Sequence, residues 1–125
     1  MTRPGLILFA HGARDPLWAR PFEAVAERVR AARPGTVVQL AFLEFMQPDL
    51  PAAGRALVDR GCSRVDIVPM FLGAGGHVRR DLPRLIGLLR ETHPGVRFAL
   101  HAAIGEVESV TEAMAAAAAA TLDAP

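Results

Sequence analysis

The chain has 125 residues, 51% hydrophobic residues and a formal net charge of +1, a composition typical of one globular domain. The near-neutral charge argues against nucleic acid or a membrane surface as the main partner. A single cysteine, Cys62, excludes an intrachain disulfide, and no apolar segment has the length needed to cross a bilayer. The apolar run Leu6–Ala10 is too short for a secretory signal, so we expect a cytoplasmic protein.

Short apolar runs alternate with segments of helical periodicity along the chain. Strands are predicted near residues 6–10, 37–45, 65–70 and 96–100. Helices are predicted after each of them, near residues 16–33, 48–60, 78–92 and 106–120. Such alternation gives right-handed βαβ units and a parallel sheet. The expected fold is a three-layer α/β sandwich with a four-stranded parallel sheet, wound as in flavodoxin, over a single domain 1–125.

Individual residues mark the expected ends of these helices. Asp15 is typical of an N-cap, and Pro16 of the first helical position. Pro48 is expected to open the second helix and Gly61 to close it. Cys62 then falls in a connecting segment, as an ordinary thiol.

The alanine tract 115–120 and His93 have mainly structural interpretations. Alanine is the strongest helix former, so the tract predicts helix rather than disorder. Its small side chains suit either the core or a contact between subunits. His93, just before Pro94, is interpreted as a residue that ends the third helix.

Ligands of open parallel sheets bind beyond the carboxyl ends of the strands. His11 directly follows the first predicted strand, and His77 ends the glycine-rich loop after the third. Because these two strands are often neighbours, both imidazoles can converge on one cleft, and Glu44 can reach the same edge. Two imidazoles and a carboxylate with open coordination positions can hold Co, Ni, Fe or Zn without trapping the ion.

Each candidate also has a structural explanation. A histidine at a strand end is more often hydrogen-bonded than a metal ligand, and this applies equally to His101. Glu44 could be a solvated loop residue, or a charge at a helix N-terminus. The glycines at 73–76 could form only a turn, or could cradle an anion at a helix N-terminus. The chain has no lysine, which excludes a P-loop, and it has no nucleophile elbow.

Segments of the chain resemble, in order, four motifs of the sirohydrochlorin chelatases in their short, single-domain CbiX-type form. Leu8–Pro16 resembles the N-terminal HGSRDP signature of this class II chelatase family, with Ala13 in place of the serine. Ala41–Glu44 followed by Pro48 resembles the second motif. The remaining similarities are Val68–Leu72, Gly76–Val78 and Asp81–Pro83 for the third motif and Ala103–Gly105 for the loop after the last strand.

This resemblance implies a chelatase fold and the insertion of a divalent metal into sirohydrochlorin, for cobalamin or sirohaem synthesis. The metal is a substrate, with Co²⁺ foremost and Fe²⁺ or Ni²⁺ as the other candidates, and no organic cofactor is implied. The family's metal-binding histidines fall on His11 and His77, and the glutamate of iron-inserting relatives falls on Glu44. These three residues are the expected catalytic groups. The short form is expected to work as a symmetric homodimer.

Sirohydrochlorin is edged with carboxylates, which arginine binds bidentately. Residues in or just after the proposed loops are therefore expected to bind the substrate: Arg14, Gly75, Gly76, Arg79 and Arg80, with Arg84 further along. The alternative for Arg79, Arg80 and Arg84 is that they are solvated helix charges.

Two other functions stay open at this point. The same histidine pair would serve a non-catalytic carrier of metal or tetrapyrrole. A histidine phosphatase also has a His-Gly after its first strand, but it usually needs an arginine just before the histidine. Ala10 stands at that position.

Overall fold

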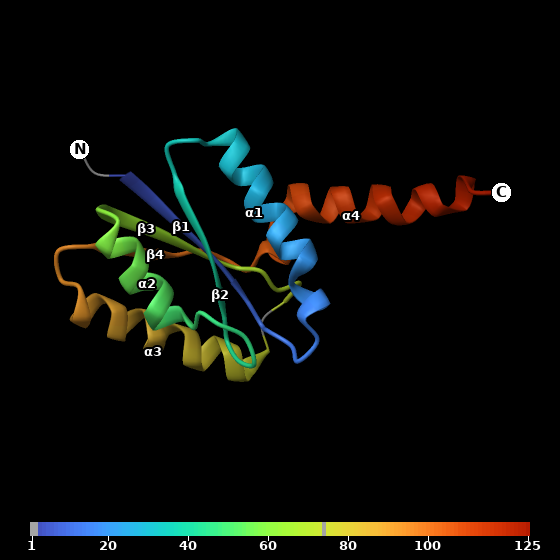
Figure 1. The fold of residues 1–125 in the computed structure, drawn as a ribbon. Helices are drawn as coiled ribbons and strands as arrows, with labels where there is room; N and C mark the ends of the chain where they lie inside the picture. Colours follow the sequence, from blue (N-terminus) through green and yellow to red (C-terminus); the bar gives the residue numbers. More distant parts are fainter. Residues whose placement is uncertain (1–2, 74) are drawn as a thin grey trace.

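The chain folds around one parallel sheet with helices on both faces (Figure 1). The computed structural model describes residues 3–73 and 75–125, and the side chain of His77 lies outside what it describes. The strand order is β2-β1-β3-β4. The strands are β1 (Arg3–Ala10), β2 (Val37–Phe42), β3 (Cys62–Pro69) and β4 (Arg97–Leu100). The predicted α/β fold with a flavodoxin-like parallel sheet is confirmed, and β1 lies beside β3 as expected.

The helices divide between the two faces of the sheet. Helices α2 (Leu50–Asp59) and α3 (Gly76–Thr92) cover one face, and α1 (Arg20–Ala32) covers the other (Figure 1). Three short helical turns, η1 (Pro16–Ala19), η2 (Ile104–Glu106) and η3 (Thr121–Asp123), flank α1 and the last helix. Within the described residues, no helix combines the length and the apolar character that crossing a membrane requires.

Side-chain caps fix where two helical segments begin. The Asp15 carboxylate accepts the N–H two residues on, which confirms the predicted cap before Pro16. The expectation that Pro48 opens the second helix is wrong. Helix α2 begins at Leu50 with Asp49 as its cap, because the carbonyl of Pro48 is turned back to accept the Phe42 N–H at 2.9 Å.

Two strand ends differ from the sequence prediction. Strand β2 stops at Phe42 rather than at residue 45. The chain turns back after Phe42, whose N–H donates to the carbonyl of Pro48, and Phe45 within this turn has a φ of +66°, which an extended strand does not accommodate. Cys62 is the first residue of β3 and not part of a connection. It is buried in the core, and this burial raises the pKa of its thiol.

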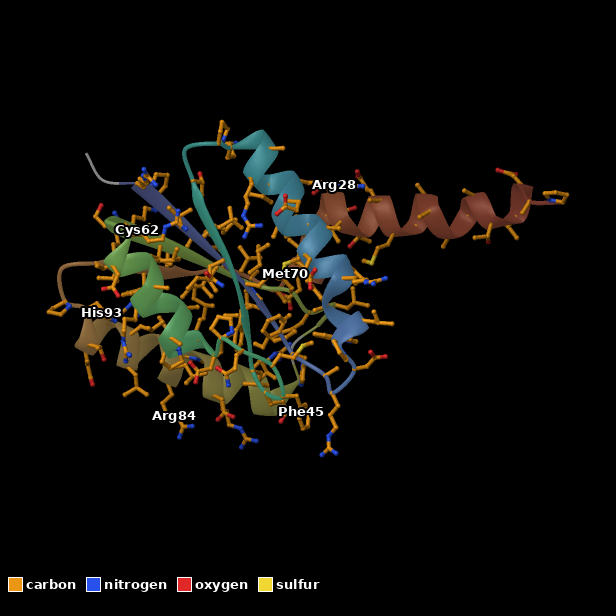
Figure 2. All side chains as sticks on the ribbon, in the orientation of Figure 1. Arg28, Phe45, Cys62, Met70, Arg84 and His93 are labelled. Carbon is orange, nitrogen blue, oxygen red and sulfur yellow. The ribbon has the colours of Figure 1, made fainter. Side chains whose placement is uncertain are left out.

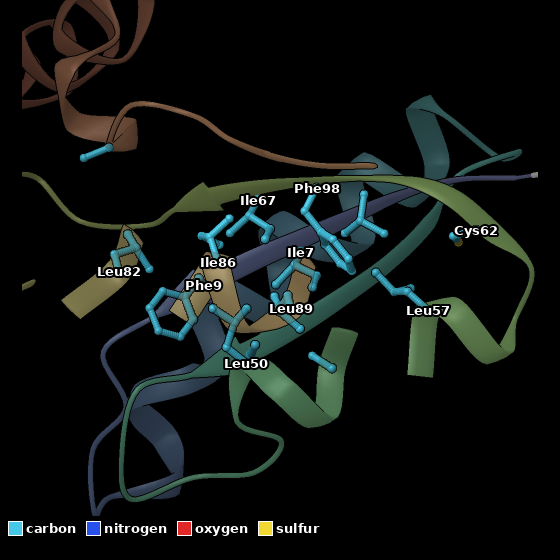
Figure 3. Close-up of a cluster of buried hydrophobic side chains, with 14 of the residues drawn as sticks. Ile7, Phe9, Leu50, Leu57, Cys62, Ile67, Leu82, Ile86, Leu89 and Phe98 are labelled. Atoms are coloured by element: carbon cyan, nitrogen blue, oxygen red, sulfur yellow. The ribbon is translucent and has the colours of Figure 1, made fainter. Parts of the chain in front are cut away.

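The main apolar core lies between the sheet and helices α2 and α3 (Figure 3). Alternate residues of β1 and β3 point into it, and α2 and α3 contribute the opposite wall. Its most deeply buried side chains are Ile7, Phe9, Leu50, Leu57, Val65, Ile67 and Ile86. A smaller cluster around Ala26 joins α1 to the other face of β1 and β2.

The alanine tract lies in α4 (Glu108–Ala120), which projects away from the sheet (Figure 1). All thirteen residues of α4 are described, and none of them is buried. The predicted helix is confirmed. Of its two predicted roles, a place in the core of the same chain is excluded, and a contact between subunits stays open.

We predict that Leu57→Ala lowers the free energy of unfolding by about 2–5 kcal/mol, since it leaves a cavity at a fully buried site. Leu88, half exposed on α3, supplies the matched control, and Leu88→Ala should change the value by about 0.5 kcal/mol or less. Urea unfolding monitored by circular dichroism measures both. Equal losses for the two variants would contradict the location of the core.

Candidate metal centre at the carboxyl edge of the sheet

Backbone hydrogen bonds join the loop after β1 to the loop after β2. The Leu43 N–H donates to the carbonyl of Ala10 at 3.0 Å, and the Glu44 N–H donates to the carbonyl of His11 at 3.1 Å. Gly12 permits this approach. Its φ is +93°, and a Cβ at this position would overlap the carbonyl oxygen of Glu44.

The loops after β3 and β4 are joined in the same way. The Gly105 N–H donates to the carbonyl of Phe71 at 2.9 Å, and a Cβ at position 105 would overlap the backbone of Leu72. The N–H of Met70 donates to the carbonyl of Phe9 at 2.7 Å, which ties this pair of loops to β1. All four loops therefore form one continuous edge.

His11 is exposed at this edge, but a contact with a buried aromatic ring restricts the orientation of its imidazole. The ring packs edge-on against Phe71, with 5.3 Å between centroids and 63° between the ring planes. Phe71 is itself buried and packs against Phe9 at 6.1 Å. Sequence reasoning did not identify Phe71 as the support of His11, because only the folded sheet brings the two strand ends together.

Glu44 and His77 belong to the neighbouring loops. The side chain of Glu44 is exposed, and its backbone lies directly beside that of His11. His77 lies in the first turn of α3, and its side chain is outside the described residues. The described side chains contain no group of three histidine, cysteine or acidic residues that could hold a metal ion. The ligand set of His11, His77 and Glu44 therefore stays a prediction.

Arg14 lies over the ring of Phe45, with its guanidinium carbon 5.0 Å from the ring centroid. This contact is a cation–π interaction, and it keeps the guanidinium at the exposed rim. Phe45 is 59% exposed and holds the left-handed backbone conformation that is uncommon outside glycine. An exposed, constrained aromatic residue in the loop that pairs with the His11 loop is a feature that the sequence analysis missed.

The other predicted substrate-binding residues lie around the start of α3. Arg79 and Arg80 are exposed, and the Arg80 side chain donates to the carbonyl of Gly76 at 3.3 Å. Gly75 is the N-cap of α3, and a Cβ at Gly75 or Gly76 would meet no atom of the chain. Arg84 lies 3.8 Å from Asp81 and is largely solvated.

His101 pairs with Asp66, its Nε2 lying 2.8 Å from Oδ1 of the carboxylate. Arg64 donates to the same carboxylate at 3.3 Å. Partial burial opposes the charged form of Asp66, but the hydrogen bonds from His101 and Arg64 outweigh it and lower the pKa of this carboxyl. His93, by contrast, ends α3, donating its backbone N–H to the carbonyl of Leu89, so its structural interpretation is confirmed.

The surface near this edge has two shallow hollows. The larger, of about 270 Å³, lies between the starts of α2 and α3 and contains none of the predicted metal ligands. The other, of about 200 Å³, is lined by Phe71, Arg79 and His101 among others. Both are below the ~300 Å³ at which small-molecule pockets usually begin. As lined by the described residues, neither of these two hollows would enclose a planar ligand of macrocycle size.

The fold and this edge define a class: doubly wound α/β proteins that present functional groups at the carboxyl ends of parallel strands. Residues 5–121 match the sequence profile of the CbiX family, so the chain belongs to that family. A solved structure from Marinobacter aquaeolei VT8, named for the cobalamin biosynthesis protein CbiX, is 30% identical with a TM-score of 0.86. That match covers 98% of this chain and 99% of the other.

Other relatives share part of their length with this chain. A sirohydrochlorin cobaltochelatase of Methanocaldococcus jannaschii is 35% identical over 88 residues, which is 70% of this chain and 62% of that protein. The sirohydrochlorin chelatase SirB of Bacillus subtilis subspecies spizizenii, solved in complex with cobalt, is 25% identical with a TM-score of 0.78. The match covers 90% of this chain but 48% of SirB, which is thus about twice as long.

We predict that Gly12→Ala destabilises the fold by more than the ~1–2 kcal/mol of a left-handed alanine, because the added Cβ also overlaps Glu44. Gly35→Ala is the matched control, since a Cβ there meets nothing. Urea unfolding of both variants tests this. A Gly12→Ala protein as stable as the Gly35→Ala protein would show that the two loops do not depend on this approach.

Proposed function

We propose that this protein is a chelatase that inserts a divalent metal ion, Co²⁺ foremost, into sirohydrochlorin or a closely related tetrapyrrole. The observation that supports this proposal most directly is the position of His11. Its imidazole is exposed at the end of β1 and packs against Phe71, and its carbonyl accepts the N–H of Glu44. Membership of the CbiX family and the names of its cobaltochelatase relatives support this reaction and this substrate. Fe²⁺ and Ni²⁺ are the other candidate metals, and the product would serve cobalamin or sirohaem synthesis.

In the proposed reaction the metal is held by His11 and His77, with Glu44 as an oxygen ligand. Neutral imidazole binds cobalt, iron and nickel alike, and an open site lets the ion leave. As pyrrole nitrogens replace the imidazoles, the macrocycle loses two N–H protons. A histidine released from the metal would accept one of these protons, and the Glu44 carboxylate would accept the second.

The macrocycle itself is proposed to lie flat against the carboxyl edge. Exposed apolar side chains of η1 and of the loops after β2 and β3 would receive its face: Leu17, Phe45 and Leu72. Arg14, Arg79 and Arg80 would bind its carboxylates. Gly75 and Gly76 would let it approach the start of α3, because neither has a packing requirement within the chain that explains glycine.

We further propose that residues 1–125 form one chelatase domain that works as a cytoplasmic homodimer. Three observations support the pairing: the edge is open, its hollows are too small to enclose a tetrapyrrole, and SirB is about twice as long as this chain. A second copy related by a twofold axis would supply the opposite wall. The lone cysteine Cys62 is compatible with a reducing compartment.

Removal of either proposed imidazole should stop the reaction. We expect His11→Ala and His77→Ala each to lower the rate of Co²⁺ insertion at least about 100-fold. Removing a residue that only orients a metal ligand already lowers activity by about 10–100-fold, and removing the ligand itself should lower it at least as much. His93→Ala is the control, since His93 lies far from Phe45 and the metal edge (Figure 2). Anaerobic absorbance of sirohydrochlorin measures all three rates.

A normal rate in both His11→Ala and His77→Ala would refute the metal site. Tight binding of macrocycle and metal by the wild-type protein, without conversion, would instead identify a carrier. Hydrolysis of an aryl phosphate at a rate abolished by His11→Ala would revive the phosphatase alternative.

The Arg14 guanidinium should bind the substrate more than it supports the fold. We expect Arg14→Ala to raise the dissociation constant of sirohydrochlorin about tenfold, the loss of one charge-assisted hydrogen bond. Arg55→Ala, on the exposed side of α2, should leave it unchanged. Fluorescence titration without metal measures both constants. Equal dissociation constants for the two variants would contradict a role of Arg14 in binding sirohydrochlorin.

A further inference from the structure

The hollow of about 200 Å³ beside the end of β4 has mostly apolar walls, and three ionisable residues line it. Arg79 comes from α3, His101 directly follows β4, and Glu106 belongs to η2. Phe71, against which the ring of His11 packs, also lines this hollow. The hollow, which we call the His101 hollow, therefore adjoins the candidate metal centre.

The hydrogen bond between His101 and Asp66 determines which ring nitrogen of His101 is free. Nε2 of His101 lies 2.8 Å from Oδ1 of Asp66. Partial burial opposes the charged form of Asp66, but hydrogen bonds from His101 and Arg64 lower its pKa, so the carboxylate is ionised and can only accept. Nε2 must therefore carry the hydrogen, which leaves the lone pair of the neutral ring on Nδ1. When the ring takes up a proton, Nδ1 becomes a second donor.

Two donors at the His101 hollow have no partner within the described part of the chain. None of the ion pairs between described side chains includes Arg79 or Glu106. The one side-chain hydrogen bond of His101 among these residues uses Nε2 and not Nδ1. A guanidinium and a protonated imidazole can both donate charge-assisted hydrogen bonds to one carboxylate. The lining residues thus supply the two donors that such a ligand needs.

Size and lining make a carboxylate side chain a suitable occupant. The volume is far above the ~15 Å³ that one water molecule requires, so a carboxylate on a short apolar stem fits. Leu82, Leu100 and Ala103 in the lining would surround the stem. The described residues offer no group that could hold a metal ion instead. Of the described lining residues only Glu106 is acidic, so it is the one group there that opposes an anion.

We propose that the His101 hollow is a subsite for one carboxylate side chain of the macrocycle, and that His101 binds this carboxylate only when its imidazole is protonated. Nδ1–H of His101 and the guanidinium of Arg79 donate to the carboxylate, while Asp66 accepts from Nε2. Binding then takes up one proton from solvent. The charged groups around His101 are Asp66 and Arg64 on β3, Arg79 on α3 and Glu106 on η2. The subsite rests on the proposed function, because its ligand is part of the proposed substrate.

Binding of sirohydrochlorin without metal, measured by fluorescence titration at about pH 8 and about pH 6, tests this proposal. The carboxylates of the macrocycle stay ionised at both values, because the pKa of an ordinary carboxyl is about 4. His101→Gln is the main variant. Its amide still donates to Asp66 but cannot take up a proton. His93→Gln is the matched control, since His93 ends α3 at the opposite edge of the sheet.

We expect the wild type and His93→Gln to gain about tenfold more affinity than His101→Gln when the pH is lowered, which is the effect of one charge-assisted hydrogen bond. His11 and His77 are present in all three proteins, so the difference between them isolates His101.

Glu106→Gln should change affinity in the opposite direction. Because it removes the negative charge that opposes the ligand, we expect a dissociation constant lowered about threefold at both pH values. Glu91→Gln, exposed near the far end of α3, should leave the constant unchanged. Circular dichroism checks that every variant keeps its helix content.

Equal pH responses of the wild type and His101→Gln would overturn the subsite, as would weaker binding by Glu106→Gln. If the wild type binds and metallates sirohydrochlorin normally in that case, the subsite alone fails and the proposed function stands. A wild type that binds no sirohydrochlorin at either pH would overturn both.

Discussion

The approach of the Gly12 backbone to the carbonyl oxygen of Glu44 is the constraint on which the carboxyl edge around His11 depends. It lets the hydrogen bonds between β1 and β2 continue beyond the last residues of both strands, up to the carbonyl of His11. Gly105 has the same function between the loops after β3 and β4. Without these two approaches, a side chain would separate the loops within each pair.

The openness of the edge would suit the proposed reaction, in which the metal is a substrate. A closed tetrahedral site would retain the ion, whereas an exposed imidazole lets an incoming ligand compete for it. Phe71 restricts the His11 ring from one side and leaves the other side accessible. Orientation without enclosure is thus achieved by an aromatic contact. The enclosure that a planar macrocycle also needs would come from the proposed second copy.

The sequence predicts the layers of this fold well, because its signals are local. Buried strands appear as apolar runs, and Asp15 caps its helical turn with its own carboxylate. Errors arise where a single residue departs from the local pattern: the left-handed conformation of Phe45 keeps β2 from extending to residue 45, and Asp49 rather than Pro48 marks the start of α2, as its N-cap. The alanine tract predicts a helix but not its partner, because alanine packs against any surface.

The candidate site is predictable only in part, because sequence signals report only on nearby residues. His11 and Glu44 follow from their positions after strands. The contacts that define their surroundings join distant parts of the chain. His11 follows β1 and Phe71 follows the neighbouring strand β3, while Asp66 and His101 are 35 residues apart in sequence. Neither contact could therefore be predicted from the sequence around either residue.

The central claim is that one chain metallates many macrocycles. The most direct measurement is the number of sirohydrochlorin molecules converted per chain, with sirohydrochlorin and Co²⁺ both in large excess under anaerobic conditions. The account predicts continued conversion through many equivalents, at a rate proportional to protein concentration and above the rate without protein. Conversion that stops at about one equivalent per chain would contradict it, because the protein would then bind its ligands without releasing a product.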